Sequence, residues 1–503
     1  MSQVILSTIN ARYMHTAFGL RYLLANMGDL RDCTEIREFT LETRPADMAE
    51  QILRASPRIV GLGVYIWNIE ATRALVATLR AVAPEVVIVV GGPEVSHEID
   101  AQPWLADVDF VVTGEGDAAF PRLCQRLLHG QRPLQKVIDG GLPAITSLHL
   151  PYDLYSDEDI ANRVIYVEAS RGCPFRCEFC LSSLDKKVRA FELDPLLRAF
   201  ESLMNRGARA FKFVDRTFNL DIDRSEAILD FFLAHVHRGL FIHFEMVPDR
   251  LPERLRERIR RFPPGSLQFE IGIQSFDPEV GRRIQRRQNL TRTFENLRFL
   301  REETGVHLHT DLIIGLPGED VATFGAGLDR LIAAGVQEVQ VGVLKRLRGT
   351  PIARHTDAFD LVFDPAAPYA ILSNADIDFM TMQRLKRFSL VWDVFWNRGA
   401  LMHAMRLLWE DGSPFHETLR FTDWLYARDG KVHAMALKHR ARRIAEYLLE
   451  RGRAQDAIDE ALVRDFAARG STPPPLQVSR SSGARADATS GAVPQRQRRH
   501  LAH

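Results

Sequence analysis

The stretch "RGCPFRCEFC", from Arg171 to Cys180, decides how this chain of 503 residues is interpreted. It holds three of the chain's five cysteines, Cys173, Cys177 and Cys180, in the spacing C-x3-C-x2-C. Soft thiolates select zinc, copper(I) or iron–sulfur clusters over hard cations. Structural zinc sites are closed by four ligands, whereas three thiolates leave one coordination position open. A zinc knuckle without its fourth ligand and a chance group of thiols are the competing interpretations.

The residues around the cysteines predict an α/β setting. "IYVEAS" (165–170) is typical of a strand, and the run from 181 to 204 is typical of a helix. Strand-like runs then recur with helix-like runs between them, which favours a barrel. These further strands are expected at 211–215, 241–247, 267–275, 306–317 and 338–347. A cluster at the carboxyl end of a strand lies where α/β barrels keep their active sites.

The cysteine loop resembles the signature of the radical S-adenosylmethionine (SAM) superfamily, C-x3-C-x-aromatic-C, with Phe179 in the aromatic position. The resemblance implies a six-stranded partial (β/α)6 barrel and a 4Fe-4S cluster on Cys173, Cys177 and Cys180. It also implies that the fourth iron binds the amino and carboxylate groups of SAM, and that the backbone at Phe179 meets the adenine. Reductive cleavage of SAM would then give a 5'-deoxyadenosyl radical.

Further segments resemble other parts of this family's SAM site. "VDRTFN" (214–219) stands where the family often has a Gly-Gly-Glu motif, and "IGIQSF" and "DLIIGLPGE" resemble the coproporphyrinogen oxidase and cobalamin-dependent branches. Any of these residues could instead be a strand-end residue without a catalytic part. His307 and His309 share one strand face and are expected to be interior histidines rather than ligands. The residues expected to bind SAM are Phe179, Asp215, Glu245, Gln274, Ile313 and Gly315.

The amino-terminal third predicts a separate doubly wound unit. Five short apolar runs, beginning with "QVILSTIN" and ending with "VDFVVTGEGD", alternate with helical patterns, as in a flavodoxin-like (Rossmann-type) parallel sheet. Its ligand site should lie outside the carboxyl ends of the strands, where glycines let the backbone approach a large flat ligand or its phosphate tail. No G-x-G-x-x-G opens a helix after the first strand, which argues against a dinucleotide.

A flavodoxin-like domain ahead of such a barrel resembles the cobalamin-binding (class B) branch of the superfamily, and "GGPEVS" and "VVTGEGD" resemble its loops. Cobalamin is therefore the expected third cofactor. The sequence lacks D-x-H-x-x-G, and Tyr13 stands where its Asp would orient His15, so we expect cobalt without a histidine below it. The residues expected to bind cobalamin are Asn10, Tyr13, His15, Tyr65, Trp67, Asn68, Gly91, Gly92, Glu94, Gly114 and Glu115.

The expected domains are a cobalamin-binding unit (1–130), a linker (131–160), a radical SAM barrel (161–360), a helical C-terminal domain (361–470) and a disordered tail (471–503). We expect the helical domain to pack on the barrel mouth and its aromatic stripes to form a core. Zero formal net charge gives no indication of nucleic-acid affinity. The sequence shows no leader and no apolar run of membrane-spanning length, so we expect a cytoplasmic protein, with Cys33 in a strand and Cys124 in a helix as reduced thiols.

Together these features predict a cobalamin-dependent radical SAM enzyme that methylates an unactivated carbon through a 5'-deoxyadenosyl radical. Its partners would be a small-molecule substrate and an electron donor such as flavodoxin or ferredoxin. An oxidative cyclase or rearrangement enzyme would use the same cofactors. A methylthiotransferase would need another cysteine-bound cluster, and a non-catalytic sensor would not need an open iron. The substrate does not follow from fold and cofactors.

Overall fold

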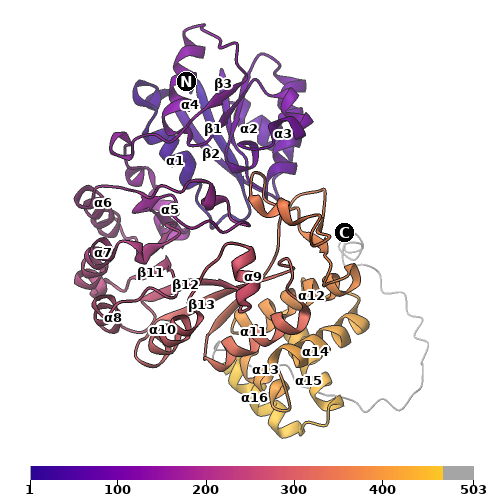
Figure 1. Cartoon of the computed structure of the whole chain (residues 1–503). Coiled ribbons are helices and arrows are strands. Elements are labelled where there is room, and N and C mark those ends of the chain that lie inside the picture. The colour runs from indigo at the N-terminus through magenta and orange to yellow at the C-terminus, as the bar shows by residue number, and fades with distance from the viewer. Residues whose placement is uncertain (1, 468–503) are drawn as a thin grey trace, which may run out of the picture.

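The computed structural model describes residues 2–467, which form three units along the chain (Figure 1). A first sheet with its helices lies at one end, a second sheet lies below it, and a bundle of helices extends from the second sheet. The disordered tail expected at 471–503 lies outside the described residues. None of the helices within residues 2–467 is long and apolar enough to cross a membrane.

The first sheet is parallel, with the strand order β2-β1-β3-β4-β5-β6. Its first five strands have the flavodoxin-like order expected from the sequence. A short sixth strand joins its edge, in residues expected to be linker. The strands are β1 (Val4–Asn10), β2 (Thr34–Thr40), β3 (Ile59–Gly63), β4 (Val87–Gly91), β5 (Phe110–Thr113) and β6 (Val137–Asp139).

Helices cover both faces of this sheet, which explains why its strands are continuous apolar runs. One face packs against α2 (Pro45–Leu53) and α3 (Ile69–Val82), and the other against α1 (Phe18–Ala25) and α4 (Gly116–Leu128). Cys124 is buried in α4, as expected. Cys33 ends a short 3-10 helix immediately before β2, so its placement in a strand was wrong by one residue.

The second sheet has six parallel strands in the order β7-β10-β11-β12-β13-β14, which confirms the partial barrel. Within the described residues, the two edge strands β7 and β14 are not paired with each other, so the barrel is open. The strands are β7 (Ile165–Val167), β10 (Ala210–Phe213), β11 (Phe241–Glu245), β12 (Leu267–Gln274), β13 (His307–Ile314) and β14 (Glu338–Val343). The helices around them are α6 (Leu193–Asn205), α7 (Ile222–His235), α8 (Glu253–Arg260), α9 (Pro278–Arg283), α10 (Leu290–Glu302) and α11 (Val321–Ala333).

The two faces of the barrel sheet differ in chemistry. On the outer face, Phe211 and Phe213 pack against rings from α6 and α7 in a fully buried core. On the inner face, Lys212, His243 and Glu270 lie on three neighbouring strands, and Glu270 contacts both of the others. This alternation follows from the period of a strand, whose successive side chains point to opposite faces.

The C-terminal helices pack mainly on the β14 edge of the barrel, and the expected contact with its mouth is limited to places such as Met382 of α12, which lies beside Gly315 after β13. Trp392 of α12 donates its Nε1 hydrogen to the Val339 carbonyl of β14 at 2.9 Å. The backbone N–H of Phe415, on α14, donates to Asp329 of α11 at 2.8 Å. The aromatic rings form a core, as expected. The helices are α12 (Phe379–Trp392), α13 (Met402–Trp409), α14 (Pro414–Asp429), α15 (Leu437–Glu450) and α16 (Gln455–Ala467).

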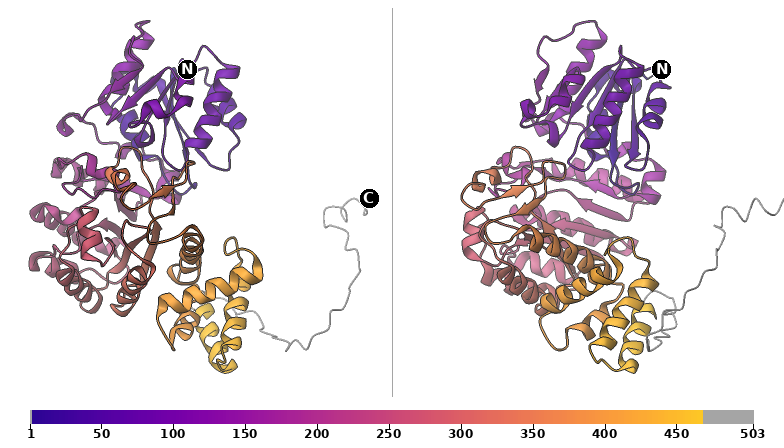
Figure 2. Two further views of the ribbon diagram at one scale, coloured as in Figure 1. Left: turned by 45° about the vertical axis from the view of Figure 1, so that its right-hand side comes forward. Right: turned by 90° about the vertical axis from the view of Figure 1, so that its right-hand side faces the viewer.

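A buried ion network joins the first unit to the barrel, and Figure 2 shows the two units directly against each other. Glu38 of β2 accepts from Arg21 of α1 at 2.7 Å and from Arg163, just before β7, at 2.6 Å. Asp159, on α5 (Asp157–Asn162), accepts from the same two guanidiniums at 2.7 and 2.9 Å. All four side chains are at most 10% exposed. Removing one partner leaves a buried charge without compensation.

We therefore expect Glu38→Ala to lower the free energy of unfolding by about 3–5 kcal/mol, the range for breaking a buried ion pair. Urea unfolding measures this change. The matched control is Glu70→Ala, whose pair with Arg73 is exposed and should change stability by no more than about 1 kcal/mol. Equal effects of the two substitutions would show that the network does not hold the units together.

Candidate functional site

The cysteine loop begins where β7 ends and is fixed by a neighbouring strand. Asp215, which follows β10, accepts hydrogen bonds from the Ala169 N–H at 2.8 Å and the Ser170 hydroxyl at 2.6 Å. A short hairpin, β8 (Ser170–Arg171) with β9 (Arg189–Ala190), then encloses the cysteines. Burial raises the pKa of Asp215 to about 6. Asp215 thus holds the entry to the loop, and it does not line the cavity described next.

Cys173, Cys177 and Cys180 line one side of a cavity of about 220 Å³ at the carboxyl ends of the barrel strands. Three of the expected SAM-binding residues, Phe179, Glu245 and Gln274, share this lining. The other three, Asp215, Ile313 and Gly315, lie outside it, and Gly315 instead forms a tight turn with φ +87° against Ile371. The structure adds polar groups that were not expected from the sequence: Arg216, Glu270, Arg286 and Asp311.

Charged side chains are held in place around this cavity. The Arg286 Nη1 lies 3.3 Å from the Cys177 sulfur, and its Nη2 donates to the Gly272 carbonyl. Arg216 donates to Glu245 at 2.8 Å. Asp311 belongs to the "DLIIGLPGE" segment, where alternation along the strand could have identified it as inward-facing. Arg286 lies between α9 and α10, where no periodic pattern identifies it.

Two buried acceptors of this cavity have no hydrogen-bond partner within residues 2–467: Gln274 Oε1 and Asp311 Oδ1, the latter 3.6 Å from His309 Nε2. Gln274 has φ +75° and follows a register shift in the pairing of β12 with β13, which turns its side chain locally. Burial raises the pKa of Asp311 above its ordinary range. Unsatisfied buried acceptors are costly in a folded protein. A ligand that carries hydroxyl or amino groups could donate hydrogen bonds to both oxygens. These acceptors therefore fit a ribose and an amino acid moiety.

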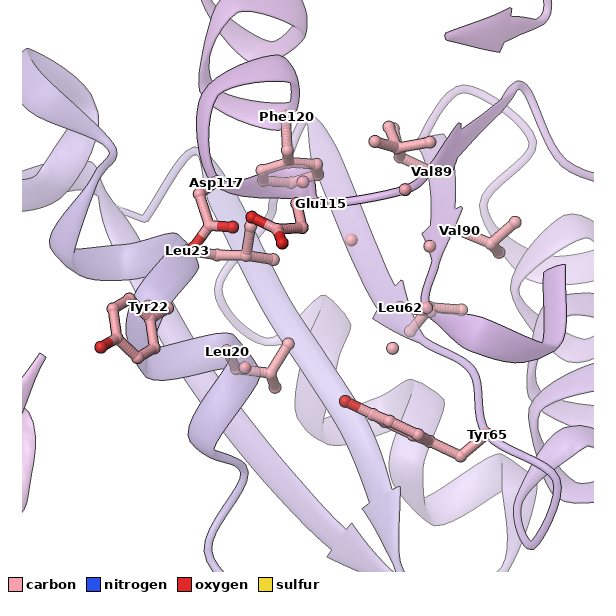
Figure 3. A pocket seen from close by; sticks show the side chains of 18 of the residues that line it. Leu20, Tyr22, Leu23, Leu62, Tyr65, Val89, Val90, Glu115, Asp117 and Phe120 are labelled. Atoms are coloured by element: carbon pink, nitrogen blue, oxygen red, sulfur yellow. The ribbon is translucent and has the colours of Figure 1, made fainter. Parts of the chain in front are cut away.

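A second cavity, of about 250 Å³, lies at the carboxyl ends of β3, β4 and β5, between the sheet and helices α1 and α4 (Figure 3). Figure 3 shows Tyr65 reaching toward Leu20 across this space, with Val89, Val90 and Phe120 on the opposite side. Seven glycines contribute bare backbone to the lining: Gly19, Gly61, Gly63, Gly91, Gly92, Gly114 and Gly116. An added Cβ would have only ordinary contacts at Gly63, whereas it would meet the Phe120 ring at Gly61 and the backbone of Val64 at Gly92. Glycine at these positions thus leaves room for a flat apolar ring close to the strands.

Five of the expected cobalamin-binding residues line this cavity: Tyr65, Gly91, Gly92, Gly114 and Glu115. A sixth, Trp67, stacks on Tyr65 with ring centroids 4.5 Å apart and an interplanar angle of 7°. The other expected residues lie outside the lining. Asn10 donates to the His15 carbonyl, Tyr13 donates to Glu158, and the buried Asn68 donates to backbone carbonyls of β1 and β3.

His15 and Glu94 have partners in the barrel unit. His15 Nδ1 lies 2.7 Å from the hydroxyl of Tyr166, on β7, and burial lowers the pKa of His15. Glu94 is buried and accepts from Tyr369 at 2.7 Å and Arg348 at 2.8 Å. Their contacts therefore join the units.

Arg171 lines the second cavity and belongs to the segment that leads into the cysteine loop. Its Nη1 donates to Glu115 at 3.0 Å and to Asp117 at 2.9 Å, and all three residues line the second cavity. In sequence, Arg171 lies two positions before Cys173. The second cavity and the cysteine loop thus share one fixed side chain.

A buried carboxyl, that of Glu319, contacts the residue that follows Gln274. Glu319 accepts a hydrogen bond from the Ser275 hydroxyl at 2.5 Å, and its other oxygen has no partner among residues 2–467. Burial raises the pKa of Glu319 to about 8. At neutral pH this carboxyl is therefore mainly protonated in the folded chain, whereas in the unfolded chain it is ionised.

From this difference we expect a pH-dependent stability. Above about pH 4.3 the unfolded chain releases the Glu319 proton while the folded chain keeps it, so stability falls by up to about 1.4 kcal/mol per pH unit until the folded pKa is reached. Glu319→Gln should remove this pH dependence. Urea unfolding at several pH values between about 5 and 8 measures it. The exposed Glu295→Gln is the control. A stability difference between wild type and Glu319→Gln that does not change with pH would contradict the assignment.

Comparisons with known proteins agree with this arrangement. Residues 5–124 match the model of the B12 binding domain, residues 167–331 match that of the radical SAM superfamily, and residues 357–490 match a family described as a protein of unknown function (DUF4080). The matched solved structures share the fold. OxsB, a cobalamin-dependent SAM radical enzyme with aqua-cobalamin bound, has a TM-score of 0.62 at 12% identity, covering 93% of this chain and 79% of that one.

A second solved structure, the radical SAM methyltransferase TsrM from Kitasatospora setae with cobalamin and a [4Fe-4S] cluster, has a TM-score of 0.56 at 17% identity, covering 70% of this chain and 74% of that one. Among curated relatives, "Uncharacterized methyltransferase PH0819" from Pyrococcus horikoshii is 25% identical and covers 60% of this chain and 70% of the relative. The methyltransferase TokK from Streptomyces tokunonensis is 24% identical over 58% of this chain, which spans about half of TokK, 47% of its length.

A radical SAM domain uses a 4Fe-4S cluster and SAM, and a B12-binding domain binds cobalamin. These are the cofactors that the three cysteines, the unsatisfied polar cavity and the glycine-lined cavity fit by their chemistry. Since both domains follow one another in a single chain with the expected strand orders, the protein belongs to the cobalamin-binding branch of the radical SAM superfamily.

Proposed function

We propose that this enzyme transfers a methyl group to an unactivated carbon of a small molecule. The observation that carries the proposal is the presence, in one chain, of an open three-cysteine site and a glycine-lined cavity, with Arg171 of the cysteine-loop segment bonded to Glu115 in the lining of that second cavity. Curated relatives that match more than half of this chain are named methyltransferases, which supports methyl transfer over a cyclisation or rearrangement. When bound, the cluster and SAM supply a 5'-deoxyadenosyl radical, and cobalamin supplies the methyl group.

The residues around the first cavity suit the groups of SAM. Cys173, Cys177 and Cys180 would hold three irons and leave the fourth open. The Arg286 guanidinium would pair with a carboxylate, and Glu245 would accept from an ammonium group. Gln274 and Asp311, whose acceptors are unsatisfied, would accept from the ribose hydroxyls. Burial at the bottom of the cavity excludes water from these contacts and strengthens them.

The residues around the second cavity suit cobalamin. The glycine backbones of Gly91, Gly92 and Gly114 would lie against its nucleotide tail, and Tyr65, with Trp67 stacked on it, would border the corrin ring. His15 is engaged by Tyr166, which supports the proposal that no histidine coordinates cobalt from below.

Other assignments have less support from this chain. A methylthiotransferase would need further cysteines for a second cluster, and the sequence offers only Cys33 and Cys124 besides the loop. Curated relatives named as ribosomal protein methylthiotransferases match about a third of this chain, 38% in the first case. We propose that an external one-electron donor such as flavodoxin or ferredoxin reduces the cluster.

The activity can be tested with the anaerobically reconstituted enzyme. With SAM and a reductant it should release 5'-deoxyadenosine, and with SAM labelled in its methyl group the label should reach a small molecule of a cell extract. Alanine at Cys173, Cys177 or Cys180 should abolish both products, because two thiolates cannot hold three irons. Alanine at Cys33 or Cys124 is the matched control and should leave iron content unchanged. Release of 5'-deoxyadenosine without transfer of methyl label would favour the cyclase or rearrangement alternative.

The second cavity gives a separate test of cobalamin binding. Gly63→Val should prevent uptake of hydroxocobalamin. A Cβ at Gly63 would lie at ordinary distances of 3.4–3.5 Å from Thr8 and Tyr65, so the chain can accommodate it, and the added methyl groups would then occupy the cavity. Absorbance after gel filtration measures the bound corrin, and iron content should not change. Gly342→Val is the control, since this glycine lies in β14, outside the cavity lining. Normal uptake by Gly63→Val would mean that cobalamin binds elsewhere.

A further inference from the structure

One segment of the chain, residues 344–371, contacts both cofactor units; we name it the strap. It leaves β14 and returns to itself, since Arg346 N–H donates to the Tyr369 carbonyl at 3.0 Å and Lys345 pairs with Ala370. Its two ends are bonded together and to the barrel: Leu344 N–H donates to the Ile314 carbonyl at 3.0 Å, and Ile371 N–H donates to the Leu344 carbonyl at 2.9 Å. The strap is therefore anchored at the end of β13.

The first contact of the strap is with the loop after β4, which follows Gly91 and Gly92 of the second cavity. Arg348 donates to Glu94 at 2.8 Å, and Tyr369 donates to the same oxygen at 2.7 Å. Arg346 forms a two-pronged pair with Glu98, with both distances 3.1 Å. The Glu94 side chain is only 4% exposed, so this ion pair is screened little by solvent.

The second contact is with the cysteine loop itself. Glu178 lies between Cys177 and Cys180 in sequence, and its side chain is 1% exposed. Its carboxylate accepts from His355 Nε2 at 2.6 Å and from Arg354, and its carbonyl accepts from the Ile352 N–H at 3.0 Å. Both the backbone and the side chain of Glu178 are thus bound by the strap.

The link between these two contacts is short and closed. Arg348 and Ile352 are four positions apart. Between them, the Thr350 hydroxyl donates to the Leu347 carbonyl at 2.6 Å, and Gly349, with φ +80°, lies against the ring of His97. The 3-10 helix Pro351–His355 follows at once. Such a link has little freedom to absorb a displacement, so a shift of the loop at Glu94 would move the backbone at Glu178.

We propose that the strap is a positioning element that couples cobalamin binding to the order of the cysteine loop, with Arg348 and Glu178 as its two anchoring residues. The inference rests on the proposed function, because it needs both cofactors to bind where we place them. In the free protein the two loops would each sample several arrangements, and binding of one cofactor would select the arrangement that the other requires. Coupling of this kind is reciprocal: each cofactor raises the affinity for the other by the same factor.

The test measures the dissociation constant for hydroxocobalamin twice, with chain that carries the cluster and with chain freed of it. We expect cluster-loaded wild type to bind at least about five-fold more tightly, the lower end of common coupling free energies. In Arg348→Gln and Glu178→Gln this ratio should fall toward one. Arg348→Lys, which keeps the charge facing Glu94, should retain part of it. Arg73→Gln, which alters an exposed ion pair of the same unit, should keep the wild-type ratio.

A further variant separates coupling from the contacts themselves. One glycine inserted between Gly349 and Thr350 removes no strap side chain but lengthens the link and opens the Thr350–Leu347 turn, so both cofactors should bind and the ratio should fall toward one. An unchanged ratio in this variant, or in both Gln variants, would overturn the inference. A wild-type ratio of one, with both cofactors bound, would overturn it while leaving the proposed function intact. Failure of wild type to bind hydroxocobalamin would overturn both.

Discussion

The structure depends on holding two parallel sheets with their ligand-binding ends toward each other. Each sheet binds ligands outside the carboxyl ends of its strands, so the chemistry needs both sets of ends in one space. Buried ion pairs provide this constraint at separate places: Glu38 with Arg21 and Arg163, Arg171 with Glu115, and Arg348 with Glu94. A buried ion pair contributes little net stability but penalises every arrangement that separates its charges. These ion pairs fix the orientation of the two sheets together with a small apolar cluster between the units, in which Tyr22 of α1 stacks on Phe191, while the main buried clusters of the two sheets are distinct.

The fold could be predicted from the sequence because its signals are local. Apolar runs such as β1, buried along its whole length, and the repeated strand–helix alternation identify both sheets, and the spacing of Cys173, Cys177 and Cys180 identifies the loop between β7 and α6. The short strand β6 was missed because only three residues form it, and none of them is buried. The position of the C-terminal helices also could not be predicted, since it depends on contacts such as Trp392 with Val339, across residues far apart in sequence.

The sites were predictable only in part, for a related reason. Glycines at strand ends mark the second cavity in sequence, and Tyr65, Gly91, Gly92 and Gly114 line it as expected. Polar residues at strand ends are a weaker indication of a ligand site, because such a residue can either bind a ligand or form hydrogen bonds within the protein. Asn68, Glu94 and Asp215 hold the chain in this structure. Arg286 comes to the cysteine loop from a segment without regular structure, and no pattern in the sequence indicates that approach.

The alternation of the barrel strands has a consequence for how such enzymes diversify. Phe211 and Phe213 belong to the aromatic core, while Lys212 between them faces the inside of the barrel. The same division holds on β11, where His243 faces inward beside the buried Phe244. A substitution at an inward position changes the surface offered to a substrate without removing a core ring. The apolar core and the polar interior of the barrel are thus encoded at alternate positions of the same strands, so an inward substitution leaves the core rings in place.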